Sequence, residues 1–132
     1  MLLVDLDLES PGLHWTPGLE PPAPITGGLL PWLADGCGNY SLWRDAIYTP
    51  RDDLPLDVLP ACGGSLRDAS LAIQRVDWGA MQRAEPDDPE IVTPMLTALR
   101  RVLDVMGGYT HILIDAPCLL YTSDAADEAY DV

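Results

Sequence analysis

No lysine occurs anywhere in this chain of 132 residues, and its seven cations are all arginines. Aspartate and glutamate together number 21, so the formal net charge is -14. A segment this acidic repels nucleic-acid phosphates, and we expect no direct nucleic-acid binding by it. A site that needs a lysine ammonium to hold a phosphate cannot be completed from these residues alone.

Cysteine is also scarce. Three thiols, at Cys37, Cys62 and Cys118, form no Cys-x-x-Cys motif, which argues against both a disulfide framework and a structural zinc site. No apolar run approaches the ~20 residues of a membrane span, and no charged leader precedes an apolar segment. We therefore expect a cytoplasmic protein. Apolar residues still make up 48% of the chain, enough to build a core.

The end of the chain has a foreign character. Residues 118–128 resemble, in frame, the translation of a transposase-based sequencing adapter. We interpret residues 118–132 as a non-native read-through tail and residues 1–117 as the biological segment. Because Met1 leads directly into an apolar run, we also expect the natural start to lie upstream.

Two short apolar runs, at residues 2–6 and 110–115, each carry an aspartate at or near their end. Continuous rather than alternating apolar residues are typical of parallel strands that are covered on both faces. A third, weaker strand is expected at residues 56–59.

Helical patterns separate these strands. Thr93 and Pro94 open a helix with apolar residues on one face, which ends at Gly107. Further helices are expected at residues 68–83 and 28–34. The segments 10–31 and 85–89 are rich in proline, glycine or acids and are expected to be loops. This order predicts an α/β fold with a mainly parallel sheet flanked by helices.

Acidic side chains stand where the two clearest strands end. Asp5-Leu6-Asp7 closes the first, and the strand is expected to end between the two acids, so they should have different roles. Asp115 closes the run Ile112–Ile114 in the form of a Walker B element, whose carboxylate anchors Mg²⁺ beside a phosphate. Ligands bind at the carboxyl edge of parallel sheets, so we expect these acids to face one site.

Three segments together resemble one family. Residues 3–13 contain Asp-Leu-Asp-Leu-Glu-Ser-Pro-Gly-Leu, residues 56–61 read Leu-Asp-Val-Leu-Pro-Ala, and residues 109–117 end in Ile-Asp-Ala-Pro. Their order and spacing are similar to those of MinD/ParA-like P-loop ATPases, the SIMIBI class with a deviant Walker A motif. The resemblance implies a partial P-loop NTPase (Rossmann-like) domain over residues 1–117.

The resemblance also implies roles for particular residues. Asp7 is expected to position the attacking water, Asp115 to anchor Mg²⁺ largely through water, and Asp5 to join the magnesium shell or support it by hydrogen bonds. A switch at residues 8–13 is expected to contact the nucleotide. Within this switch, the residues expected to contact the nucleotide are Glu9, Pro11 and Gly12. ATP and Mg²⁺ are the cofactors of such a parent protein, which forms an ATP-dependent homodimer and reaches DNA or a membrane through regions outside this chain. Chromosome or plasmid partitioning, or cellular positioning, is the implied process.

One departure from the family pattern is large. The lysine-containing, glycine-rich phosphate loop that should precede residue 1 is missing, and the three Gly-Gly pairs of the chain do not supply it. We therefore expect no ATP binding or hydrolysis by this chain alone. Cys62 also stands where the family usually has glycine.

Two alternatives remain open. A haloacid-dehalogenase-like phosphatase would use Asp5 as nucleophile and Asp7 as general acid. Such an enzyme also needs a lysine later in the chain and a different residue in place of Glu9. A non-catalytic interaction module would use tryptophan side chains as its surface. Against this, we expect the four tryptophans to lie in or beside the core. His14 is not a convincing base, and His111 is expected to pack on its strand.

Overall fold

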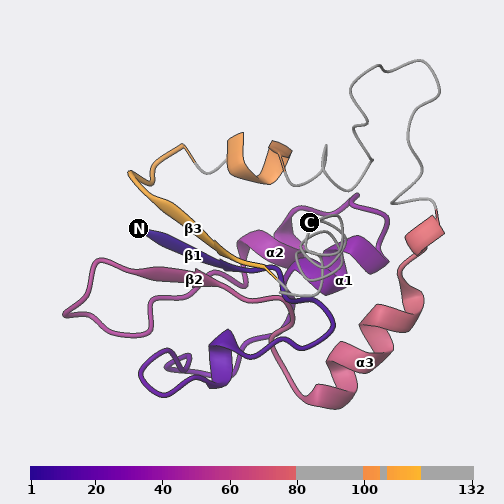
Figure 1. Cartoon of the computed structure of the whole chain (residues 1–132), viewed down its shortest axis with the longest axis horizontal. Helices are drawn as coiled ribbons and strands as arrows, with labels where there is room; N and C mark the ends of the chain where they lie inside the picture. Colours follow the sequence, from indigo (N-terminus) through magenta and orange to yellow (C-terminus); the bar gives the residue numbers. More distant parts are fainter. Residues whose placement is uncertain (80–99, 105–106, 117–132) are drawn as a thin grey trace, which may run out of the picture.

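A three-stranded parallel sheet forms the centre of the molecule (Figure 1). The computed structural model describes residues 1–79, 100–104 and 107–116. Its strands are β1 (Leu2–Asp5), β2 (Asp57–Leu59) and β3 (Ile112–Asp115), in the order β2-β1-β3. The predicted α/β class, the parallel sheet and the three strand positions are thus confirmed. The loop expected at 85–89, most of the helix expected at 93–107 and the tail at 118–132 lie outside the described residues.

The register places the strand ends together. Leu2 is the partner of Asp57 on one side and of Ile112 on the other. The β1–β3 pairing runs on without a shift, so Asp5 is the partner of Asp115. The expectation that the two acid-tipped strands are neighbours is therefore confirmed.

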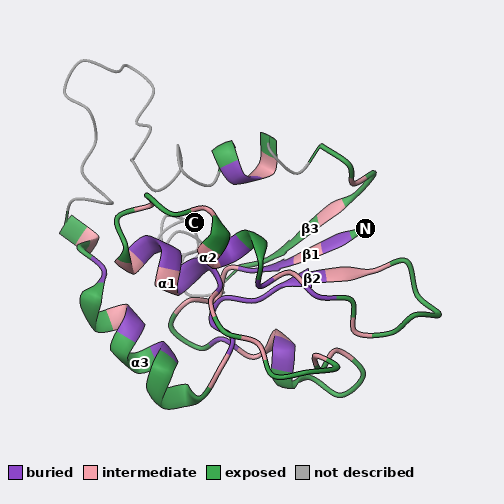
Figure 2. Ribbon diagram, turned by 180° about the vertical axis from the view of Figure 1, so that it is seen from behind, coloured by how far each residue is buried: buried purple, intermediate pink, exposed green. Residues whose placement is uncertain are grey.

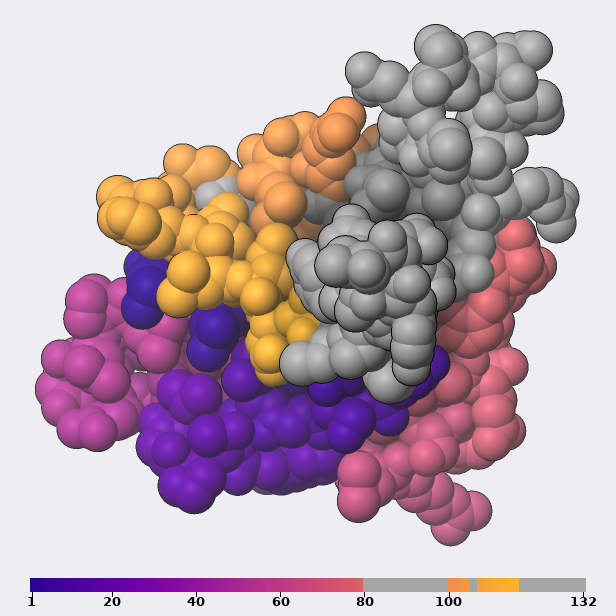
Figure 3. All heavy atoms as spheres, in the orientation of Figure 1, coloured from indigo at the N-terminus to yellow at the C-terminus, as the bar shows by residue number. Residues whose placement is uncertain are grey.

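Burial differs sharply between the central strand and β3 (Figure 2). Leu2 and Val4 of β1 are buried, whereas Leu113 and Ile114 of β3 are 51% and 46% exposed. Figure 3 shows residues of this segment, in yellow-orange, on the molecular surface. The expectation that both faces of each strand are covered holds for β1 and is wrong for β3, because continuous apolar sequence does not reveal how far the rest of the chain covers a strand.

Short helices lie around the sheet. The helix α1 (Leu29–Ala34) confirms the helix expected at 28–34, and α3 (Leu66–Arg75) replaces the one expected at 68–83. A short helix α2 (Ser41–Arg44) and a 3-10 turn η1 (Leu13–Trp15), the latter inside a segment expected to be loop, were not predicted. Residues 100–104 are helical, as expected.

The boundaries of α3 follow from local chemistry. Ser65 accepts a hydrogen bond from the backbone of Asp68, and the Asp68 carboxylate accepts one from the Ser65 backbone, which completes a capping box. The helix therefore begins before residue 68. It ends at Arg75, and the extended backbone of the next residue, Val76 (φ -71°, ψ 128°), interrupts it. The expectation of one continuous helix over 68–83 is therefore wrong, and residues 80–83 lie outside the described residues.

The entry into α1 depends on a glycine. Gly28 has φ of 133°, and a Cβ there would stand 2.7 Å from the carbonyl oxygens of both Pro60 and Ala61. These same oxygens accept hydrogen bonds from Leu29 and Leu30, the first two residues of α1. Close approach of the backbones thus fixes α1 on the segment that follows β2 and satisfies N–H groups that a helix start leaves free.

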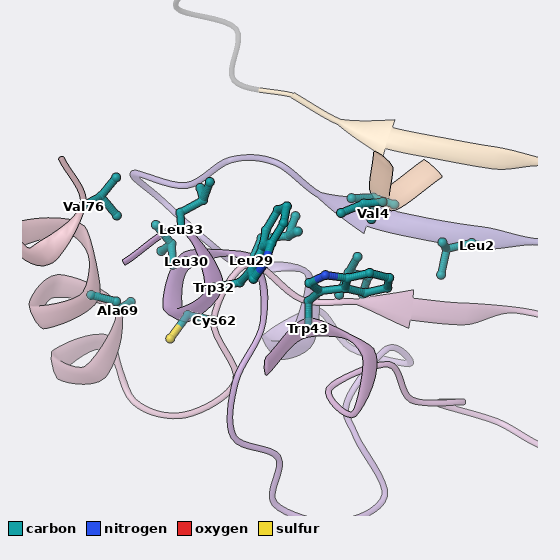
Figure 4. Close-up of a cluster of buried hydrophobic side chains, with 13 residues drawn as sticks. Leu2, Val4, Leu29, Leu30, Trp32, Leu33, Trp43, Cys62, Ala69 and Val76 are labelled. Carbon is teal, nitrogen blue, oxygen red and sulfur yellow. The ribbon is translucent and has the colours of Figure 1, made fainter. Parts of the chain in front are cut away.

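The core packs α1, α2 and α3 against β1 (Figure 4). Trp32 and Trp43 are each 1% exposed and meet edge to face, with ring centroids 6.3 Å apart. The expected burial of tryptophan is confirmed for these two and for the half-buried Trp78, but it is wrong for Trp15, which is 43% exposed.

His111 also departs from expectation. It is exposed and lies just before β3, with its ring beside the Thr110 hydroxyl. Within the part of the chain that the structure describes, no helix has the length and apolar character needed to cross a membrane.

Candidate acidic site at the carboxyl edge of the sheet

Asp5 and Asp115 end adjacent parallel strands in register, at the carboxyl edge of the sheet. Neighbouring strands lie about 4.8 Å apart, and paired residues of parallel strands place their side chains on the same face. The Leu6 N–H donates to the Asp115 carbonyl oxygen at 2.8 Å, which extends the pairing one step past the acids. Two of the predicted site residues are thereby brought together.

Both oxygens of the Asp5 carboxylate accept hydrogen bonds from backbone N–H groups. Its Oδ1 accepts from the Asp7 N–H at 3.1 Å, and its Oδ2 accepts from Gly12 at 3.2 Å and Leu13 at 3.3 Å. The side chain is also 0% exposed. Asp5 therefore folds the segment that follows β1 back over the end of the sheet.

Burial raises the pKa of the Asp5 carboxyl, and the negative charge of Asp115 raises that pKa further. The three backbone hydrogen bonds act in the opposite direction, because they favour the ionised form. The raised pKa means that desolvation outweighs the hydrogen bonds.

The other two acids present a different environment. Asp115 is exposed and Asp7 is half-buried. Among the described residues, neither carboxylate has a hydrogen-bonded or ion-paired side-chain partner. The site therefore combines one closed acid, Asp5, with two acids whose oxygens can still accept a ligand.

The predicted switch residues occupy three environments. The Gly12 N–H bonds Asp5, and the Gly12 carbonyl accepts hydrogen bonds from the Trp15 N–H and the Thr16 hydroxyl. Pro11 is buried, whereas Glu9 is exposed. The structure thus joins Gly12 to the acidic edge and keeps Pro11 beside it in the chain, while Glu9 faces solvent.

Tyr48 is a residue that sequence reasoning missed. Its hydroxyl donates to the Leu19 carbonyl oxygen at 2.5 Å, which ties the segment after η1 to the chain that leads into β2. Burial raises its pKa to about 12, with smaller contributions from the charges of Asp5 and Glu20. A tyrosine in a proline-rich region carries no motif, and only its proximity to Asp5 links it to the site.

Two cavities lie away from the acidic edge. One of about 600 Å³ opens between α1 and α3 and includes Cys62 and Arg75 in its lining. The other, of about 290 Å³, lies beside η1 and the proline-rich segment that follows. Neither is lined by Asp5, Asp7 or Asp115.

Metal-ligand chemistry at the acidic edge is limited in the described residues. No group of three or more histidine, cysteine, aspartate or glutamate side chains in residues 1–79, 100–104 and 107–116 is arranged to hold a metal ion. Because both oxygens of Asp5 already accept hydrogen bonds, this residue does not fit direct coordination. Asp115 and Asp7 fit contact with a hydrated cation, in which water molecules fill most of the ion's shell.

Comparison with protein-family models, with curated proteins and with solved structures finds no match to this chain.

Proposed function

We propose that this chain is a part of a nucleoside-triphosphate hydrolase of the MinD/ParA type and carries the acidic residues of its active site. The observation that carries the proposal is the in-register pairing of Asp5 with Asp115 at the carboxyl edge of a parallel sheet. Ligands of open α/β sheets bind at that edge. The motif order along the chain supports the same assignment.

Each acid has its own role in this proposal. Asp115 holds Mg²⁺ through water, and the metal, when bound, neutralises charge on the phosphates. Asp7 orients the attacking water. Asp5 is a positioning residue, because its carboxylate fixes the Asp7 backbone N–H and the loop through Gly12 and Leu13.

The same geometry speaks against the haloacid-dehalogenase-like alternative. That reaction requires Asp5 to attack a phosphoryl group as a nucleophile. Here the Asp5 carboxylate is 0% exposed and accepts three backbone hydrogen bonds. An attacking oxygen would have to leave these donors and reach solvent first.

Nucleotide binding in this proposal needs a lysine-containing phosphate loop that residues 1–132 do not contain. The chain alone therefore binds divalent cations weakly and does not hydrolyse ATP. ATP-dependent dimerisation, and contact with DNA or a membrane, belong to the longer protein in this proposal.

Paramagnetic Mn²⁺, used in place of Mg²⁺, tests the acidic edge in the chain itself. We expect selective broadening of the amide signals of Asp7, Asp115 and Ala116 in heteronuclear NMR spectra. Asp115→Asn should remove this broadening, whereas Asp52→Asn, an equal charge change at an exposed residue elsewhere, should leave it intact. Broadening spread evenly over the acidic surface would contradict the proposal.

The hydrolytic role is tested in the longer protein encoded by the source DNA. We expect an in-frame deviant Walker A motif upstream and ATPase activity that Asp7→Asn and Asp115→Asn each reduce by at least about 100-fold. Asp52→Asn should retain full activity. Absence of that motif, or full activity in the Asp7 variant, would overturn the assignment.

A further inference from the structure

A second candidate site lies beside η1, outside the acidic edge. Trp15, Pro21, Pro24 and Ile25 line an open cavity of about 290 Å³. This volume lies at the lower end of the range of about 300–1,000 Å³ that is typical of small-molecule pockets, so the cavity suits a small group. Figure 1 draws the segment that forms it as a loop below the sheet.

Most of the cavity surface is apolar, but the buried His14 ring, Gly64 and Glu20, which carries a carboxylate, also belong to its lining. Glu20 accepts a hydrogen bond from the Gly18 N–H through Oε2 at 2.8 Å, which holds the side chain in place. Among the residues that the structure describes, no cation pairs with Glu20. One carboxylate oxygen therefore remains for a ligand.

Trp15 supplies the second recognition element. Its side chain is 43% exposed, although the ring of the buried His14 lies 4.0 Å from it, centroid to centroid. An exposed indole costs solvation free energy, and indole rings attract ammonium groups through the negative potential of the ring face. An apolar wall, an indole and a fixed carboxylate together match the chemistry of a lysine side chain, with its alkyl stem and terminal ammonium.

The charge of the chain favours the same occupant. Without the four acids of the non-native tail, 17 acidic residues stand against seven arginines, so residues 1–117 have a formal net charge of -10. Beside Glu20 in the chain, the Leu19 carbonyl oxygen accepts a hydrogen bond from Tyr48, whose pKa is raised by burial and, to a smaller extent, by the negative charges of Asp5 and Glu20. An acidic protein steers basic partners toward its surface.

We propose that the cavity lined by Trp15, Glu20, Pro21, Pro24 and Ile25 docks a lysine side chain of a partner protein. Lysine is favoured over arginine because one Glu20 oxygen is already engaged by Gly18. A single ammonium suits the remaining oxygen, whereas a guanidinium fork is matched to two. The docking site is independent of the proposed hydrolase function, since none of the three site acids lines the cavity.

A pair of short peptides tests the proposal on the full chain. The probe is acetyl-Gly-Lys-Gly-amide, and its control is the same peptide with norleucine, which keeps the alkyl stem and lacks the ammonium. We expect the lysine peptide to shift the Trp15 indole and the Gly18 and Glu20 amide signals in NMR spectra. A Kd on the order of 1 mM is the expected strength for one side chain.

Three variants make the test specific. Glu20→Gln and Trp15→Leu should each weaken binding by about 2- to 5-fold, the range for one exposed ion pair or cation–π contact. Asp52→Asn, with the same charge change at a distant exposed site, should bind as the unmodified chain does. Both altered side chains in the cavity are solvent-exposed, so folding should be retained and is checked by the same spectra.

Four outcomes would overturn the proposal. The first two are equal binding of the norleucine peptide and unchanged affinity in Glu20→Gln. The third is the absence of a shift at Trp15 when the peptide concentration is about 20 times the expected Kd. The fourth is tighter binding of free spermidine than of the peptide at the same residues. The last would assign the cavity to a small polyamine instead of a protein side chain.

Discussion

Asp5 and Asp115 are cross-strand partners in a parallel sheet, yet one is buried and hydrogen-bonded while the other is exposed. The two carboxylates therefore have different structural roles. Asp5 uses its two oxygens to hold the backbone of the following loop, and Asp115 keeps its carboxylate open to solvent. Removing one carboxylate or the other should accordingly change different properties of the protein.

Removing the Asp5 carboxylate should destabilise the protein and loosen the loop after β1. In Asp5→Ala, the N–H groups of Asp7, Gly12 and Leu13 lose their acceptor, which should cost about 1–3 kcal/mol after the relief of burying a charge. Urea unfolding measures the cost, and amide hydrogen exchange at Gly12 and Leu13 should accelerate. Asp52→Ala should change neither quantity, and unchanged exchange in the Asp5 variant would contradict the assigned hydrogen bonds.

The charge of Asp115 should be detectable in the titration of Asp5. Asp115 raises the pKa of Asp5, so Asp115→Asn should lower that pKa, while burial keeps it above its ordinary value of 3.8. A raised carboxyl pKa gives stability that is present below pH 3.8 and lost as pH rises through the folded-state value. In Asp115→Asn, the pH range between the ordinary pKa of Asp5 and its folded-state pKa should become narrower. Carboxyl ¹³C shifts of Asp5 measure the change, and a pKa that stayed constant or rose would refute the coupling.

Tyr48 should control stability at alkaline pH. Its pKa is raised from 10.0 to about 12, so between these values the folded state keeps a proton that the unfolded state releases. Stability should therefore fall as pH rises through this window. Urea unfolding at a series of pH values should show a shallower loss in Tyr48→Phe. Equal slopes in the two proteins would show that the hydroxyl does not titrate as described.

Gly28 should tolerate no side chain. Gly28→Ala places a Cβ 2.7 Å from two carbonyl oxygens at a φ of 133°, and should cost roughly 2–4 kcal/mol. Gly36 provides a matched comparison, because it also has positive φ (70°) but a Cβ added there would meet nothing within 4 Å. Gly36→Ala should cost only about 1 kcal/mol. If the two variants lost similar amounts of stability in thermal or urea unfolding, the close approach of the backbone at Gly28 would not be the cause of the destabilisation.

Two tryptophans should differ strongly in their contribution to stability. Trp43 is 1% exposed in the core and Trp15 is 43% exposed beside η1. Trp43→Ala should cost about 3–5 kcal/mol, because it leaves a large cavity. Trp15→Ala should cost less than about 1 kcal/mol. A large loss in the Trp15 variant would show that the indole supports the fold rather than a binding surface.

The strands and their acidic ends could be predicted because each signal is local. An apolar run followed by aspartate marks β1 and β3, and these strands do end at Asp5 and Asp115. The helix expected at 28–34 is also a short local segment, and α1 (Leu29–Ala34) confirms it. Structure that depends on a few consecutive residues is therefore legible from the sequence.

Long-range relationships were harder to predict. The exposure of β3 depends on how far distant segments cover it, and the burial of Asp5 depends on a loop that returns through Gly12 and Leu13. The start of α3 could have been predicted from the sequence, because Ser65 and Asp68 have the spacing of a capping box. Tyr48 and the cavity beside Trp15 were not, since they arise from contacts between distant segments.

The order β2-β1-β3 has a kinetic consequence. The central strand is the first of the three to be synthesised, and its partners Asp57 and Ile112 follow Leu2 by about 55 and 110 positions. No two of these parallel strands can form a hairpin, so their pairing with one another depends on long-range contacts and should be slow. On a ribosome that adds about 5–20 residues per second, β1 waits several seconds for its last neighbour. During that interval its apolar side chains depend on the early helices, or on a chaperone, for cover.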